Sequence, residues 1–221
     1  SVTIDTTAPV ASITSAPSSP TGSTSASFSF TADEPVGGFQ CSIDGGAFAS
    51  CSSPKGYSGL AEGSHTFRVK ATADLAGNAG APAQHTWTID TTAPAFASAT
   101  AADDTLTVTF DEALDPGQVP AGSAFTVTRN GSPLGDPTVA VSGANVTLTL
   151  PVTLGHGDVV TVAYTKPGSG ATLRDAAANE VSTFAAKPVT NTTFGQAPAT
   201  PTPASPADAA RLNTATPTLS A

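Results

Sequence analysis

The chain has 221 residues, of which 39% are hydrophobic and only 11% are charged, and its net charge is −9. The acidic balance argues against nucleic acid or an anionic membrane surface as a partner. No apolar run approaches the roughly 18 residues of a membrane helix, so no membrane insertion is expected in this segment. The low charge also leaves few side chains suited to acid–base catalysis.

Apolar and polar residues alternate with a period of two throughout the first half of the chain. This pattern predicts strands that bury one face and expose the other to solvent. The residues expected to point inward fall in three runs: Ala26, Phe28 and Phe30; Phe67, Val69 and Ala71; and His85, Trp87 and Ile89.

The second half of the chain shows the same alternation of apolar and polar residues. Turn-forming sequences separate its runs, among them "RNGS" at 129–132 and "SGAN" at 142–145. Many short strands at this spacing predict an all-β fold made of antiparallel β-sandwiches. The inward residues are expected to be Leu106, Val108 and Phe110; Val146, Leu148 and Leu150; and Val160, Val162 and Tyr164.

The heptapeptide "TIDTTAP" occurs twice, at 3–9 and at 88–94. Its isoleucine is expected to end a strand, and its proline stiffens the chain that follows. We therefore interpret the heptapeptide as the seam between modules, in a chain excised from a longer array. The expected parts are the end of a preceding repeat with its linker (1–9), a first module (10–90), a linker (91–94), a second module (95–193), and a Pro/Ala/Thr-rich linker that runs into a further module (194–221).

Two groups of motifs resemble known repeat families. The run "FQCSIDGGAFASCSSPKGYSGLAEGSHTFRVKA", followed by "DLAGN" and "TWTIDTTAP", resembles the bacterial Ig-like repeats of large surface proteins and adhesins. The motifs "LTVTFDEALD", "AFTVTRNG", "VTVAYTKPG" and "LRDAAANEV" resemble a second type, the SwmB-like repeat. The resemblance implies tandem Ig-like antiparallel β-sandwiches joined by short Pro-containing linkers. One departure is Ala73, an extra residue in "ATADLAGN" that we expect to shift that corner.

Cys41 and Cys51 are the only cysteines and flank the hairpin "CSIDGGAFASC". If residues 45–47 form the loop, Cys41 lies opposite Cys51, within reach of a disulfide. A lone pair lacks the other two ligands of a structural zinc site. The sequence therefore predicts a disulfide and an oxidising compartment, with two buried thiols as the alternative.

Carboxylates recur at the same three places in both modules: the entering linker, and two loops that an Ig-like fold brings to the same end. Convergent oxygen ligands of this kind suit Ca²⁺, which would stiffen the seams. Asp and Asn in tight turns also cap their own backbone, so turn formation is the alternative. The candidate ligands are Asp90, Asp111, Glu112 and Asp175 for the second module, and Asp5, Glu34 and Asp74 for the first; Asn179, Asp33 and Asn78 lie in the same loops.

Motifs of known catalytic sites are missing from the sequence, including G-x-S-x-G, H-E-x-x-H and the Walker motif. We expect His65, His85 and His156 to be packing or surface residues, and the chain not to be an enzyme. The expected function is a stalk segment of a secreted or cell-surface bacterial protein, an adhesin, whose partners are neighbouring repeats of the same chain. The alternative is a spacer module of a secreted polysaccharide-degrading enzyme.

Overall fold

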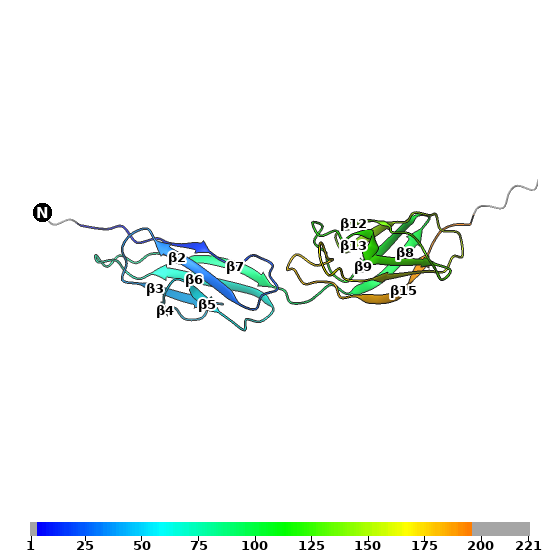
Figure 1. Cartoon of the computed structure of the whole chain (residues 1–221). Coiled ribbons are helices and arrows are strands. Elements are labelled where there is room, and N and C mark those ends of the chain that lie inside the picture. The colour runs from blue at the N-terminus through cyan, green and yellow to red at the C-terminus, as the bar shows by residue number, and fades with distance from the viewer. Residues whose placement is uncertain (1–3, 196–221) are drawn as a thin grey trace, which may run out of the picture.

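The computed structural model describes residues 4–195. Two elongated lobes lie end to end and meet at the residue 90–94 linker (Figure 1). The strands of the first lobe, which we call the first module, lie within residues 11–89, and those of the second module within residues 96–191. The prediction of an all-β fold is confirmed, since strands form nearly all of the regular structure.

The first module contains two antiparallel sheets. One sheet has three strands in the order β1–β2–β5, and the other has four in the order β4–β3–β6–β7. The strand bounds are β1 Ala11–Ser15, β2 Ala26–Ala32, β3 Phe39–Ile43, β4 Ala49–Cys51, β5 Lys55–Tyr57, β6 Gly63–Ala71 and β7 Ala83–Ile89.

Aromatic side chains form the centre of the first core. The rings of Phe28 and Phe67 stack with their centroids 4.1 Å apart, and Trp87 lies 5.1 Å from Phe28. All three side chains are at most 1% exposed. Phe28 comes from β2 in the three-stranded sheet, and Phe67 and Trp87 come from β6 and β7 in the four-stranded sheet. The core therefore lies between the two layers, as the alternation predicted.

The predicted disulfide is present, but the predicted hairpin register is wrong. Cys41 pairs with Ala49 across β3 and β4, and Cys51 pairs with Phe39. The two cysteines are therefore diagonal neighbours, with Cα atoms 5.8 Å apart. The loop is longer than expected because residues 44–48 all lie outside the strands.

The strands of the second module form a continuous ladder in the order β11–β10–β14–β15–β8–β9–β13–β12. Strand β15 pairs antiparallel with β14 and parallel with β8, so it passes from one layer of the sandwich to the other. The bounds are β8 Phe96–Ala102, β9 Thr105–Phe110, a 3₁₀ turn η1 Gly122–Ala124, β10 Phe125–Arg129, β11 Ser132–Pro133, β12 Thr138–Ser142, β13 Asn145–Thr149, β14 Val160–Tyr164 and β15 Phe184–Asn191.

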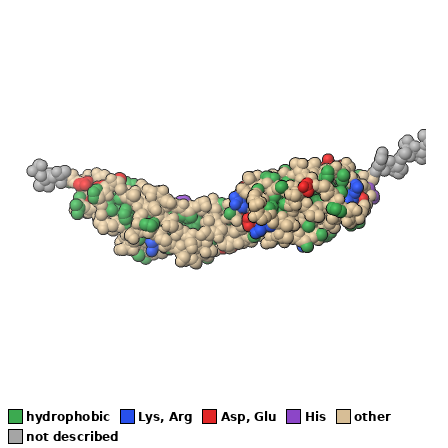
Figure 2. Space-filling model, in the orientation of Figure 1, with side chains coloured by type: hydrophobic (Ala, Val, Ile, Leu, Met, Phe, Trp, Pro, Cys, Tyr) green, Lys and Arg blue, Asp and Glu red, His purple; other side chains and the backbone are tan. Residues whose placement is uncertain are grey.

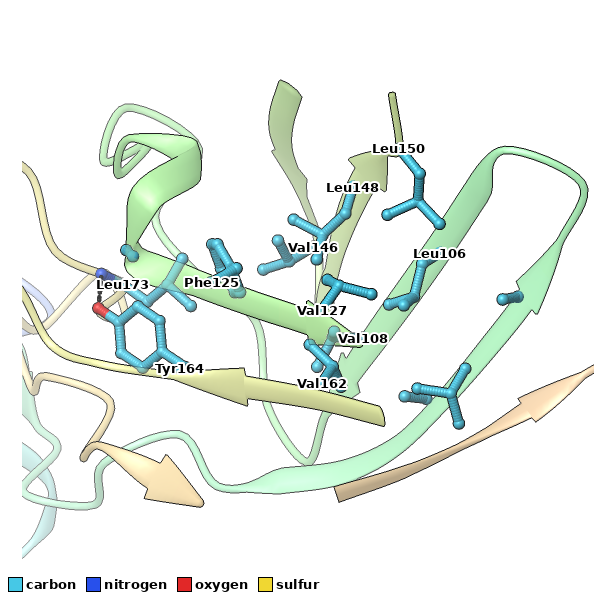
Figure 3. Packing of buried hydrophobic residues seen from close by; sticks show 14 of the residues in the cluster. Leu106, Val108, Phe125, Val127, Val146, Leu148, Leu150, Val162, Tyr164 and Leu173 are labelled. Atoms are coloured by element: carbon cyan, nitrogen blue, oxygen red, sulfur yellow. Dashed lines mark hydrogen bonds between the residues drawn. The ribbon is translucent and has the colours of Figure 1, made fainter. Parts of the chain in front are cut away.

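Figure 3 shows the second core, where aliphatic side chains from facing strands interdigitate. Leu106 and Leu148 belong to one layer, Val127 and Val162 to the other, and all four are at most 1% exposed. Tyr164 is also fully buried, and its hydroxyl oxygen accepts a hydrogen bond of 3.1 Å from the backbone N–H of Leu173. This bond fixes the start of the loop that leads to Asp175.

The inward residues predicted from alternation lie in the two cores, with His85 only partly buried. Within residues 4–195, no helix is long and apolar enough to cross a membrane. The predicted start of a further module falls on residues 196–221, which lie outside the described residues.

Candidate functional site

The two modules are joined by hydrogen bonds as well as by the linker. The backbone N–H of Gly22 in the first module donates to the carbonyl oxygen of Ala177 in the second at 2.9 Å. The Asn179 amide donates to the carbonyl oxygen of Asp90 at 2.8 Å. Gly22 is fixed in turn by its neighbour Thr21, which bonds to Thr88 and to the N–H of Asp90. The end of the first module therefore contacts a defined surface of the second.

Three of the predicted carboxylates meet at this join. Asp90, Glu112 and Asp175 each place one carboxylate oxygen within 4.8 Å of the others. Asp90 comes from the linker, Glu112 from the segment after β9, and Asp175 from the loop before β15. Loops at the same end of a sandwich bring these residues together although they are far apart in the sequence.

Two of these carboxylates also stabilise their own turns. Asp90 Oδ1 accepts a hydrogen bond from the backbone N–H of Thr92 at 3.1 Å. Asp175 accepts from the backbone N–H of Asn179 at 2.8 Å and from its side-chain amide at 2.9 Å. The turn-forming role considered as the alternative is therefore present. It does not exclude a cation, because each carboxylate oxygen has two lone pairs.

Glu112 differs from the other two. Its Oε1 atom is buried and has no hydrogen-bond partner among the described residues. Burial raises the pKa of this carboxyl, and the negative charges of Asp90 and Asp175, then Asp111 and Glu62, raise it further. An unpaired buried oxygen among like charges is costly, and a bound cation would remove that cost.

The first module has the same arrangement at its own N-terminal end. Asp5, Glu34 and Asp74 also bring one oxygen each within 4.8 Å of the others. Asn78 donates to the carbonyl oxygen of Asp5 at 3.1 Å and to the Asp74 carboxylate at 3.0 Å. Ala73, the extra residue, does not disturb these contacts.

Glu34 matches Glu112 in detail. Its Oε1 atom is again buried and without a partner in the described part of the chain. Burial raises its pKa, and Asp5, Asp74 and Asp33 add to the effect. Figure 2 shows acidic atoms at this end of the first module, next to the point where the chain enters.

Asp111 does not belong to the carboxylate cluster. Its Oδ1 accepts a hydrogen bond of 2.8 Å from the backbone N–H of Ala95, the residue after the seam proline. Asp33 accepts the same bond from Val10 at 2.8 Å in the first module. These two aspartates therefore attach the entering chain to the module.

Glu62 was not expected at this site. It accepts hydrogen bonds from the hydroxyls of Thr91 at 2.7 Å and Thr92 at 3.2 Å, both in the linker. Together with Asp90, Asp111 and Glu112 it lines an open hollow at the join. The sequence "GLAEG" carries no signal for this role, since it depends on where the linker runs after β7.

A second polar network in the first module joins a buried histidine to an exposed aspartate. His65 Nδ1 is 2.8 Å from Asp44 Oδ2, and its Nε2 is 2.7 Å from the carbonyl oxygen of Ala61. The side chain is 9% exposed and its ring lies against Trp87. Hydrogen bonds to Ala61 and to Asp44 raise the pKa of His65. The expectation of a packing residue is therefore incomplete, because both ring nitrogens face acceptors.

The family model of the "Putative flagellar system-associated repeat" matches residues 89–169, which are 81 of the 221 residues. The match begins at the last residue of β7 and covers β8 to β14, so it includes Asp90 and Glu112 but not Asp175. No curated protein matches the sequence. The match supports the resemblance of the second module to a repeat; it does not reach the body of the first module, whose Ig-like relationship stays a prediction.

Proposed function

We propose that this chain is a non-catalytic stalk segment of a large secreted or cell-surface bacterial protein that acts in adhesion. Each module buries its own core, and the join limits bending, so that a stack of modules holds a distal binding domain away from the cell. The observation that carries this proposal is the join itself. Its carboxylates and its Asn-to-linker hydrogen bond recur at the N-terminal end of the first module.

The disulfide supports an extracellular location. The Cys41–Cys51 bond forms and persists in oxidising compartments, such as the bacterial surface or the surrounding medium. The few charged side chains and the many exposed threonines and serines suit the solvent-facing sides of a spacer.

The second part of the proposal is that Ca²⁺ binds at the joins. Asp90, Glu112 and Asp175 offer only oxygen ligands, which Ca²⁺ prefers, and their charge is suited to a divalent cation. Ca²⁺ takes six to eight oxygens, so water or main-chain oxygens would complete its shell. The unpaired buried oxygen of Glu112 is the observation that favours a cation over turn formation alone.

Calorimetric melting of the full chain, with calcium and then with excess chelator, tests this part. A ligand at 100 times its Kd stabilises the native state by about 2.7 kcal/mol. For a module of this size, that raises the melting temperature by roughly 10 °C or more. Identical melts in calcium and chelator would contradict the calcium site and leave the stalk role standing.

Two matched variants show which carboxylate cluster binds calcium. Glu112→Gln keeps the shape of the side chain but removes its charge, so it should abolish the calcium shift of the second module only. Glu34→Gln should do the same for the first module. A shift that survives both substitutions would mean that the ion binds elsewhere.

Surface digestion tests the stalk role. Brief trypsin treatment of intact bacteria should release peptides of this chain, with a cytoplasmic protein as the control for lysis. Finding the chain only in the cytoplasmic fraction would overturn the proposal. A chain recovered from the medium together with polysaccharide hydrolysis would favour the enzyme-spacer alternative.

A further inference from the structure

We propose that the N-terminal end of the first module is a second docking surface, which binds the C-terminal end of another copy of the first module. First modules would then stack head to tail through the same join that links the first module to the second. This inference rests on the proposed stalk function and adds the identity of the partner. We call the docking surface the N-terminal pole, defined by Asp5, Glu34, Asp74, Leu75, Ala76 and Asn78.

The N-terminal pole reproduces the receiving side of the observed join. In the second module, Asp175 holds Asn179, and the Asn179 amide bonds to the linker oxygen of Asp90. In the first module, Asn78 is held by Asp74 in the same way and bonds to the linker oxygen of Asp5. The turn Asp74–Asn78 therefore corresponds to the turn Asp175–Asn179, residue for residue.

The two turns differ in what covers them. Ala177 is 6% exposed, and its carbonyl oxygen accepts the bond from Gly22. Ala76 occupies the corresponding place but is exposed, and no backbone donor reaches its oxygen within residues 4–195. Asp175 is likewise 4% exposed, whereas its counterpart Asp74 is only half-buried. The pole thus presents an acceptor and an acidic group that the observed join covers.

Exposed apolar side chains lie at the same end. Leu75 is fully exposed at the tip of the turn, where the second module has the smaller Ala176. Ile4 is 82% exposed, whereas Ile89, at the same position of the repeated heptapeptide, is 0% exposed because it ends β7. A preceding module that ended in the same strand would bury Ile4. Leu75 would stay at the edge of such a join, because its counterpart Ala176 is exposed in the observed one.

The shape of the N-terminal pole fits the C-terminal end of another first module. At the observed join, a Cβ added to Gly22 would lie 2.8 Å from Asn179 Oδ1 and 3.1 Å from the carbonyl oxygen of Ala177. A side chain at this position would push Asn179 and the Ala177 carbonyl away, so glycine favours the approach. Asn78 and Ala76 would meet the incoming chain in the same positions, so a partner with the Thr21–Gly22 turn beside its last strand fits best. The first module has both, and its exit sequence "TIDTTAP" is identical to the one that enters the pole.

A tandem duplication tests the inference within the full chain. Residues 3–87 are repeated in place, so that the new seam reads "TIDTTAP" like the natural one. Ala81→Ser in the upstream copy marks its peptides by mass. Hydrogen exchange of the turn at residues 74–78 is then compared between the two copies. The upstream copy has a free pole and serves as the internal control.

The Ala76 carbonyl oxygen of the downstream copy would accept a bond from Gly22 of the upstream copy, which would stabilise the turn against opening. We therefore expect the amides of the downstream turn to exchange about fivefold more slowly than those of the upstream turn, the effect of roughly one hydrogen bond. Gly22→Val in the upstream copy should remove this difference. Gly22→Val in the downstream copy should instead speed exchange only at residues 175–179 of the second module. Each variant should change hydrogen exchange at one join only. A variant that unfolds the protein would instead speed exchange at both joins.

Equal exchange in the two copies, unchanged by Gly22→Val, would overturn the inference. The turn at 175–179 separates this result from failure of the proposed function. If that turn is protected in the same sample, the natural join holds and only the second docking surface fails. If neither the downstream turn at 74–78 nor the turn at 175–179 exchanges more slowly than the free upstream turn, the join itself does not form. That result would also contradict the proposed stalk function.

Discussion

Asn179 donates its side-chain amide to the carbonyl oxygen of Asp90, a residue that precedes it by 89 positions. The same amide also donates to the carboxylate of Asp175, which accepts the backbone N–H of Asn179 as well. One side chain therefore ties the linker to the loop that carries a candidate cation ligand.

Asn179→Ala should destabilise the second module. The substitution removes one neutral hydrogen bond and one to a charged carboxylate, together worth about 2 kcal/mol. The second calorimetric transition should fall by roughly 10 °C. Asn78→Ala is the matched variant and should lower the first transition by less, because Asp5 is exposed whereas Asp90 is partly buried. An unchanged second transition would show that the bond to Asp90 contributes nothing to stability.

Tyr164→Phe should also destabilise the second module, with little change in side-chain volume. Removing the hydroxyl leaves the backbone N–H of Leu173 buried without an acceptor. Such an orphaned donor costs about 1–3 kcal/mol. Tyr57→Phe is the control, because the hydroxyl of Tyr57 makes no hydrogen bond to the described residues. Thermal melting of both variants should show a loss only for Tyr164→Phe.

The faces of the strands could be predicted from the sequence, whereas the register of the β3–β4 hairpin could not. Alternation fixes which residues of a strand face the core, because neighbouring side chains point in opposite directions. A shift of two residues leaves every side chain on the same face. Pairing Cys51 with Phe39 instead of Cys41 therefore keeps the pattern intact, and only the conformation of the residue 44–48 loop decides between the registers.

The carboxylate clusters could be predicted because their residues recur in corresponding loops of both modules. The separate role of Asp111 could not, since its neighbour Glu112 offers the same functional group. What separates them is the backbone N–H of Ala95, which lies beside Asp111 after folding. The role of Gly22 could not be predicted either, because the advantage of glycine comes from the close contact with Asn179 and Ala177 in the other module.

The first module should lose stability as pH rises through the folded-state pKa of His65. The folded-state pKa of His65 is raised above its ordinary value of 6.5, by hydrogen bonds to Ala61 and then to Asp44. Protonated His65 therefore contributes its full stabilisation below about pH 6.5, and the contribution is lost as pH rises through the folded-state pKa.

Melting the chain at pH 5.5 and pH 8.5 checks this sign. The first transition should be higher at pH 5.5, and His65→Asn should reduce the difference. Glu34, whose pKa is also raised, contributes with the same sign. His85→Gln is the control and should keep the pH dependence. Among residues 4–195, the His85 ring has one hydrogen-bond partner, the carbonyl oxygen of Pro17. A first transition that is higher at pH 8.5 would contradict the charged state of His65.

Removing the disulfide should destabilise the first module alone. The bond closes a loop between residues 10 positions apart, which the chain-entropy relation values at about 2–3 kcal/mol. The double variant Cys41→Ala/Cys51→Ala is suitable because Cys41 is buried and a serine hydroxyl there would need a partner. The first transition should fall by roughly 10–20 °C, and the second should stay unchanged. Reducing the unmodified chain should have the same effect, whereas a fall in both transitions would mean that the modules unfold as one unit.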